Sequence, residues 1–97
     1  MRVMISQPMN GKTQTQIEEE RSDLIEKLNN SGCFVVNNIF TDEAPVNSDA
    51  ALYYLAKSID VMSGVDAVIF MKGWENARGC VIEHEIALKY HKFIQEL

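Results

Sequence analysis

The sequence predicts an α/β fold in which a small, mostly parallel sheet of four to five strands lies between two layers of helices. Strand-like and helix-like segments alternate along the chain in the order βαβαβαβ, which favours parallel strands joined by helices. Residues 2–6 and 66–71 are continuous apolar runs, as in strands buried on both faces. The 97 residues suffice for one domain and are too few for two. The prediction is one three-layer domain over residues 1–97, of the flavodoxin-like or Rossmann-like kind.

The N-terminal third supplies the first strand and the first helix. Residues 2–6, RVMIS, form the strand and run into a polar loop. Thr13 or Thr15 can cap a helix that ends before Gly32. One face of this helix is apolar and carries Ile17, Leu24, Ile25 and Leu28.

The middle third supplies the second strand and the second helix. Residues 33–40, CFVVNNIF, are rich in β-branched and aromatic side chains, so they predict a strand. A polar loop over 41–49, which ends in the candidate helix caps Ser48 and Asp49, leads to a helix over 50–63, which Gly64 ends. The apolar face of this helix carries Leu52, Leu55, Ala56, Ile59 and Met62.

The C-terminal third supplies the third strand at 66–71, a loop at 73–76, a third helix and a short last strand in KFIQEL, residues 92–97. The third helix repeats one face at positions 79, 82, 83, 86, 87 and 90. Every position of that face is small, apolar or aromatic except Glu83. Burying a carboxylate costs free energy unless it has a partner, a shifted pKa or a chemical role.

Glu83 has two interpretations. Nearby amides or Arg78 can satisfy it as a structural carboxylate. Alternatively, it acts on a ligand, because it lies in the opening turns of a helix that begins at the carboxyl end of a strand, where open α/β sheets bind ligands. A carboxylate in that position can attack a sugar C1′ and form a covalent ester.

Three loops should converge on this edge of the sheet: SQPMNGK, NIFTDEAP and KGWENARG. The first joins a strand to a helix start, where free amides favour an anion, so it can cradle a phosphate or a sugar hydroxyl. It can equally be a plain turn, because it matches no standard phosphate-binding motif. The candidate residues of this loop are Ser6, Gln7, Pro8, Met9, Asn10 and Gly11.

Two further side chains are open to both functional and structural interpretations. Asp60 lies at the border of the apolar face of the second helix, where charges are commonly solvated. Trp74, in the loop after the third strand, can stack on a base or close over the core.

Composition and charge limit the kinds of partner, compartment and metal site that we expect. The net charge of −5, with nine scattered Lys and Arg residues, argues against a nucleic-acid coat. No apolar run is long enough to span a membrane, and no secretory signal is visible, so we expect a cytoplasmic protein. Cys33 and Cys80 have no metal-ligand spacing, and His84 and His91 are isolated, so no metal site is expected.

The C-terminal half resembles the nucleoside 2-deoxyribosyltransferase superfamily. That motif places an Asp at the start of an apolar strand, then a Gly, a Glu four residues later and an Ala four beyond it; the matching residues are Asp66, Gly79, Glu83 and Ala87. The opening MISQPMNGK and the segment GWENARGC resemble more closely a branch of uncharacterised, often phage-encoded relatives called DUF4406. The resemblance spans nearly the whole chain.

The resemblance implies an enzyme that cleaves or transfers the N-glycosidic bond of a deoxynucleoside or its 5′-monophosphate. It implies that Glu83 is the nucleophile, that Asp60 contacts the sugar and assists proton transfer, and that the Ser6–Gly11 loop surrounds the sugar and its 5′ end. Gly79, from the motif, and Trp74, from its place in the loop, are further substrate-binding candidates. It implies no metal or organic cofactor, and a homodimer or higher oligomer. The alternative is a nucleotide-binding or regulatory protein of the same fold without turnover.

Overall fold

Strands and helices alternate along the whole chain, as the sequence predicts. A computed structural model describes residues 1–97. Its elements are β1 (Arg2–Ser6), α1 (Gln14–Asn30), β2 (Phe34–Val35), α2 (Ala50–Ser63), β3 (Ala67–Phe70), the 3-10 turn η1 (Trp74–Asn76), α3 (Arg78–Lys89) and β4 (Phe93–Glu96).

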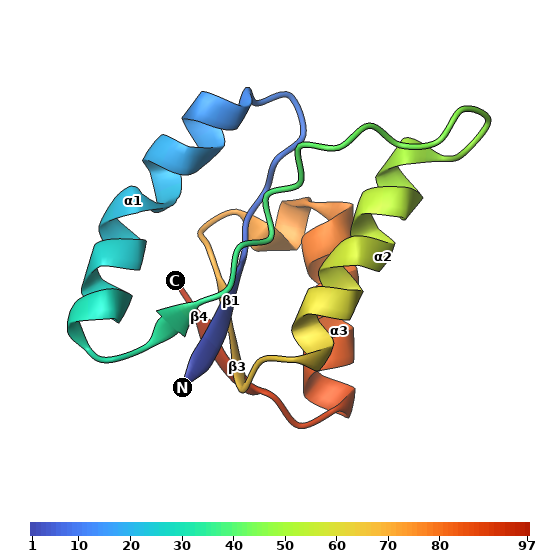
Figure 1. The fold of residues 1–97 in the computed structure, drawn as a ribbon. Coiled ribbons are helices and arrows are strands. Elements are labelled where there is room, and N and C mark those ends of the chain that lie inside the picture. Colours follow the sequence, from blue (N-terminus) through green and yellow to red (C-terminus); the bar gives the residue numbers. More distant parts are fainter.

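The sheet has four strands in the order β2-β1-β3-β4, and every neighbouring pair is parallel. Helix α1 covers one face, and α2 and α3 cover the other (Figure 1). The chain leaves β1 toward β2 on one side and returns to β3 on the other, so the strand order reverses beside β1. This confirms the predicted three-layer α/β fold, and it puts the ligand-binding edge of such sheets at the carboxyl ends of β1 and β3.

Alternate side chains of the central strands build two apolar clusters, one on each face of the sheet. Toward α1, a small cluster of Val3, Ala67 and Ile69 packs against Leu24 and Leu28. Toward α2 and α3, the larger cluster contains Met4, Met62, Val65, Val68, Phe70 and Ala87. The continuous apolar runs of β1 and β3 are therefore explained by burial on both faces.

Strand β2 is much shorter than the predicted strand over 33–40, since only Phe34–Val35 pair as a strand. The backbone of Val36 still donates to Val3, but at Asn38 the side chain replaces the backbone ladder. Its Nδ2 donates to the carbonyl of Ile5 at 2.7 Å. An amide side chain thus ends the strand and leaves residues 36–49 as an irregular connection that runs outward to α2 (Figure 1).

Both predicted helix starts in the first half are confirmed. Thr13 caps α1 in a capping box: its hydroxyl accepts from the Gln16 backbone, and the Gln16 side chain accepts from the Thr13 backbone. Asp49 caps α2 by accepting from the backbone of Leu52. None of the helices is both long and apolar enough to cross a membrane.

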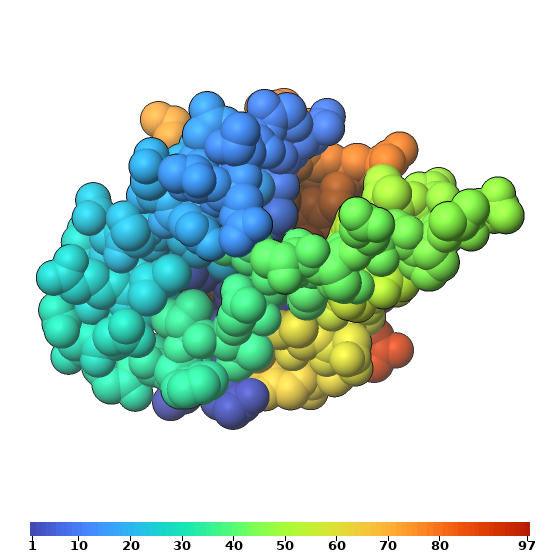
Figure 2. All heavy atoms as spheres, turned by 45° about the horizontal axis from the view of Figure 1, so that its top comes forward, coloured from blue at the N-terminus to red at the C-terminus, as the bar shows by residue number.

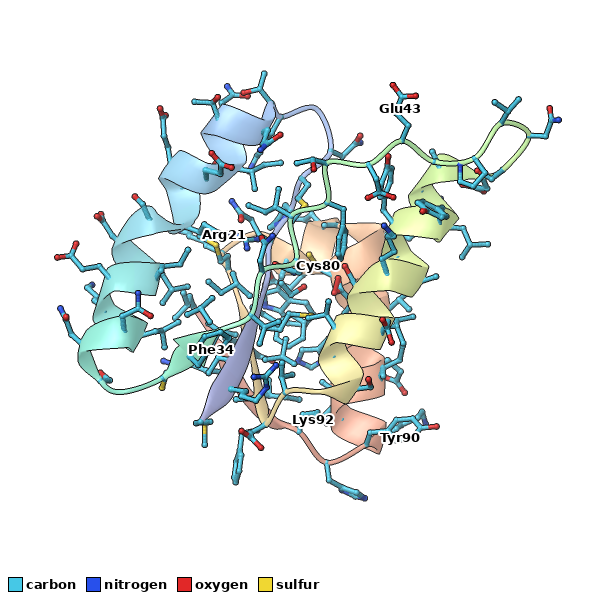
Figure 3. All side chains as sticks on the ribbon, viewed as in Figure 1. Arg21, Phe34, Glu43, Cys80, Tyr90 and Lys92 are labelled. Carbon is cyan, nitrogen blue, oxygen red and sulfur yellow. The ribbon has the colours of Figure 1, made fainter.

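Helix α3 is rotated relative to the prediction. Its buried residues are Cys80, Glu83 and Ala87. Ile82 is 37% exposed and Tyr90 73% exposed, although both were expected in the buried face. Tyr90 ends the helix and its side chain points away from the sheet (Figure 3). The buried face of the helix is therefore turned away from Ile82 and Tyr90 toward Cys80, and Glu83 belongs to both the predicted and the observed face.

Candidate functional site

A cavity of about 930 Å³ opens at the carboxyl ends of the central strands. Figure 2 shows the hollow between the N-terminal loop, the connection after β2 and the start of α3. All three loops that the sequence predicts at this edge contribute to it. The lining residues from these loops are Gln7, Pro8, Met9, Asn10, Asn38, Ile39, Phe40, Gly73, Asn76, Ala77, Arg78 and Gly79.

Glu83 lies in the wall of this cavity and is only 7% exposed. One carboxylate oxygen, Oε1, accepts from the hydroxyl of Ser6 at 3.4 Å, while Oε2 is buried without a hydrogen-bond partner. Burial raises the pKa of Glu83 to about 7, against the opposing effects of the Ser6 hydroxyl and the positive charge of Arg21. The carboxyl group can therefore change its charge near neutral pH, which suits an acid, a base or a nucleophile.

Arg78 does not satisfy Glu83. It forms no ion pair within 4 Å, and its side chain is exposed at the start of α3. The alternative in which Arg78 makes Glu83 a structural carboxylate is therefore wrong for this structure. The Ser6 contact, at the long end of hydrogen-bond distances, leaves most of the acceptor capacity of the carboxylate unused.

Some residues of the predicted loop after β1 line the cavity and others do not. Ser6 is buried beneath the cavity and holds Glu83. Gln7, Pro8, Met9 and Asn10 line the cavity. Gly11 does not line the cavity. Its φ of 78° lies in the left-handed region, which glycine adopts readily, so Gly11 serves as the turn residue.

Sequence reasoning missed a buried network beside this loop. Arg21 on α1 is 2% exposed. Its Nε donates to Gln7 Oε1 and its Nη1 to Asn38 Oδ1, both at 2.7 Å. Gln7 Nε2 donates in turn to the carbonyl of Ile17 and to Glu20. A signal existed, because positions 17, 21, 24 and 28 follow helical spacing and Arg21 is the charged member of that stripe.

Part of the cavity lining is apolar and aromatic. It comprises Ile39 and Phe40 from the connection and Ala51, Tyr54 and Leu55 from α2. The connection is fastened to α2 at Asp42, whose carboxylate accepts from Tyr53 at 2.8 Å and pairs with Lys57, and whose carbonyl accepts from Tyr54 at 2.6 Å. These bonds tie the connection that carries Ile39 and Phe40 to α2.

The structure does not bring Asp60 to this site. Its side chain is exposed, and the residues through which α2 lines the cavity are Ala51, Tyr54, Leu55 and Ser58. Asp60 lies on a different face of α2 from these residues. Its expected contact with the sugar has no support in the geometry of the single chain.

Trp74 is also outside the cavity lining, whereas Gly79 belongs to it. The Trp74 ring stacks on His84, with centroids 4.2 Å apart and planes 11° from parallel, and contacts Phe70. His84 in turn bonds Glu96 of β4 at 2.7 Å. Of the two interpretations of Trp74, the structure supports closure over the core.

The start of α3 is the remaining polar feature of the cavity. Ala77 is its N-cap residue and offers no side-chain cap, so the first amides of the helix are not bound by a capping side chain. Arg78 and Gly79 in this turn line the cavity. No group of three His, Cys, Asp or Glu side chains is arranged to hold a metal ion, and Cys33 and Cys80 are free thiols.

Comparison with known proteins identifies the family. No curated protein and no solved structure matches the chain. The family model described as "Domain of unknown function (DUF4406)" matches residues 1–96, nearly the full length. The chain therefore belongs to the DUF4406 family.

Proposed function

We propose that this protein cleaves or transfers the N-glycosidic bond of a deoxynucleoside or its 5′-monophosphate, with Glu83 as the nucleophile. The observation that carries the proposal is a buried carboxyl group in the wall of an open cavity, with one oxygen free of any hydrogen bond. The resemblance of Asp66, Gly79, Glu83 and Ala87 to the nucleoside 2-deoxyribosyltransferase motif supplies the reaction class. The proposed reaction uses neither a metal nor an organic cofactor.

The reaction has two displacements. A Glu83 oxygen forms a bond to C1′ while the bond from C1′ to the base nitrogen breaks, and the electron pair leaves with the base, which takes a proton from water. Water or a second base then attacks C1′ and releases the Glu83 carboxylate, and the proton that this nucleophile loses neutralises the hydroxide left by the first step. Splitting one displacement into two is the usual advantage of a carboxylate nucleophile.

The cavity suits the two parts of such a substrate. Its volume of about 930 Å³ lies within the range of small-molecule sites, which is roughly 300–1,000 Å³. The wall of Ile39, Phe40 and Tyr54 offers a surface for a planar base. Gln7, Asn10 and Glu83, also in the lining, offer polar groups to a sugar.

A 5′-phosphate would fit at the start of α3. The first-turn amides there are free of a side-chain cap, and the positive end of the helix dipole favours an anion. Arg78 adds a positive charge at the same rim. These features favour a deoxynucleoside 5′-monophosphate over the free nucleoside.

The rate of base release should rise with pH and level off above about pH 7. Only the ionised carboxylate of Glu83 attacks C1′, and the pKa of that group is raised to about 7. Below pH 7 we expect roughly a tenfold loss of kcat/KM for each pH unit. Chromatographic assay of free base from pH 5 to 9 measures the profile. A rate that is flat across this range would contradict an attacking carboxylate.

A second function has one observation in its favour. Glu83 is the only carboxylate that lines the cavity, and Asp60 lies outside it, so no second carboxyl group stands ready to protonate a leaving base. The alternative is a protein that binds a nucleotide without turnover, as a sensor or regulator. Thermal-shift screening separates the two, because a bound ligand stabilises the fold whether or not it reacts. Stabilisation by a deoxynucleotide without release of base would favour the binding protein.

We further propose a cytoplasmic homodimer, formed through the outer faces of α2 and α3. Leu52, Val81, Ile82 and Leu88 on these helices are exposed apolar side chains. A domain of this size gains stability by burying such a surface in a second copy. The larger apolar core lies directly beneath these two helices.

Light scattering after size exclusion should give twice the chain mass of 11.0 kDa. The double substitution Val81→Lys and Leu88→Lys should yield a folded monomer, since the lysines of the two copies would then repel one another across the interface. Phe93→Lys is the matched control, because Phe93 is also an exposed apolar side chain but lies on β4. A wild-type monomer, or dissociation by the control alone, would rule out this interface.

A further inference from the structure

The most unusual charge in the molecule is the buried guanidinium of Arg21. Arginine is almost never fully buried unless it is paired with an acid. Arg21 is 2% exposed and forms no ion pair, and its Nη2 is buried without a hydrogen-bond partner. An apolar side chain of similar size would cost less free energy at such a position. The charge therefore calls for an explanation beyond packing.

The direct partners of Arg21 belong to the cavity. Its two hydrogen bonds go to the amide oxygens of Gln7 and Asn38, and both of these residues line the cavity. The same bonds fix which way each amide faces, because the oxygen of each must point to the guanidinium. Figure 3 shows Arg21 reaching from α1 toward the end of β1 and the connection after β2.

Arg21 and Glu83 approach the same strand end from opposite faces of the sheet. Ser6 bonds Glu83, and the next residue, Gln7, bonds Arg21. Successive residues of an extended chain point to opposite sides, so this dipeptide separates the two charges. Each acts on the other through space: the positive charge of Arg21 lowers the pKa of Glu83, and the negative charge of Glu83 raises the pKa of Arg21, both against the larger effect of burial.

No other cation is as well placed to balance Glu83. Lys12 is paired with Glu20 at 3.0 Å, and Arg78 is exposed at the rim. The remaining charged or titratable side chains around the site are Cys80 and Tyr54 in the lining and Glu18 beside Arg21. Burial lowers the pKa of Arg21 to about 10, which leaves it charged at neutral pH.

We propose that Arg21 is a positioning residue of this site: its hydrogen bonds fix the orientation of the Gln7 and Asn38 amides in the cavity, and its buried positive charge favours the ionised form of Glu83 on the other face of the sheet. The inference deepens the proposed function, since it explains how a buried carboxylate stays available for attack. It concerns the protonation of Glu83, however, and its test needs no turnover.

The test is the carboxyl titration of Glu83, followed by NMR in protein labelled with carbon-13 at the glutamate carboxyl groups and assigned with Glu83→Gln. In Arg21→Met the pKa of Glu83 should rise above its wild-type value, because the compensating charge is gone. In Arg21→Lys, which keeps the charge but not the forked geometry, it should rise clearly less. Lys27→Met is the matched control: it removes an exposed charge from the same helix and should leave Glu83 unchanged.

Arg21→Gln is the second variant in case Arg21→Met does not fold, because a glutamine can still donate to one of the two amides. An unchanged Glu83 pKa in a folded Arg21→Met or Arg21→Gln protein would overturn the inference. So would an equal rise in Arg21→Lys, which would assign the effect to lost hydrogen bonds and not to charge. If the titration shifts as expected but no base is released by wild type, the inference stands and the proposed reaction falls.

Discussion

Glu83→Gln should reduce the release of base from deoxynucleosides and their 5′-monophosphates by at least about a thousandfold, as expected when a nucleophile is removed. The amide nearly matches the carboxyl group in shape, so the cavity and the contact with Ser6 should survive. It cannot form the ester at C1′. The loss should appear in kcat, because the missing step is chemical and not the binding of substrate.

The matched control is Glu85→Gln, two residues further along α3. Glu85 is exposed and pairs with Lys89, outside the cavity lining, so its removal should leave base release near the wild-type rate. Comparable release by Glu83→Gln and wild type would exclude Glu83 as the nucleophile, whereas no release by either protein would leave only the binding function. Binding of a deoxynucleotide, followed by thermal shift, should persist in Glu83→Gln.

Wild type should lose about 3 kcal/mol of stability relative to Glu83→Gln between pH 4.5 and pH 8. The pKa of Glu83 in the folded state is about 7, above its ordinary value of 4.5. Below pH 4.5 the group is neutral whether the chain is folded or not. As pH rises, the unfolded chain loses this proton first, so the folded state becomes less stable until Glu83 itself ionises near pH 7. The glutamine side chain does not titrate, so the Glu83→Gln variant should lack this pH-dependent loss of stability.

Urea unfolding of both proteins at several pH values measures this difference. Comparing the two proteins is necessary because other groups titrate in the opposite sense: Lys12 holds the pKa of Glu20 below its ordinary value, and Lys57 does the same for Asp42. These contributions cancel in the difference. A difference that stays constant from pH 4.5 to 8 would show that Glu83 is well solvated, contrary to its burial.

The parts of the fold that depend on local sequence were predictable. Apolar runs identify β1 and β3, and Thr13 and Asp49 mark the helix starts, because capping depends on neighbouring residues alone. The length of β2 was not predictable, since it depends on the Asn38 side chain meeting the carbonyl of Ile5, 33 residues away in sequence. Local β propensity cannot report such a contact.

The site was predictable where one residue interrupts an apolar stripe. That signal identified Glu83, and the same signal at Arg21 would have identified the second buried charge. The positions of Asp60 and Trp74 outside the cavity lining were not predictable in this way. Each lies at the border of its element, where a small rotation decides between cavity, core and solvent.

The rotation of α3 shows the limit of periodicity. A helical repeat fits two neighbouring faces almost equally well, so Ile82 and Tyr90 were assigned to the buried side that Cys80 occupies. Packing against β3 and β4 selects between them. Glu83 is insensitive to this choice because it lies where the two faces overlap.

A crystal structure of Glu83→Gln with a bound deoxynucleoside 5′-monophosphate tests the central claim most directly. The measured quantity is the distance from the residue 83 side-chain oxygen to the sugar C1′. We predict about 3–3.5 Å, the approach needed for attack, with the base against Phe40 and Tyr54. A nucleotide bound with C1′ turned away from residue 83, or bound outside the cavity altogether, would contradict the account.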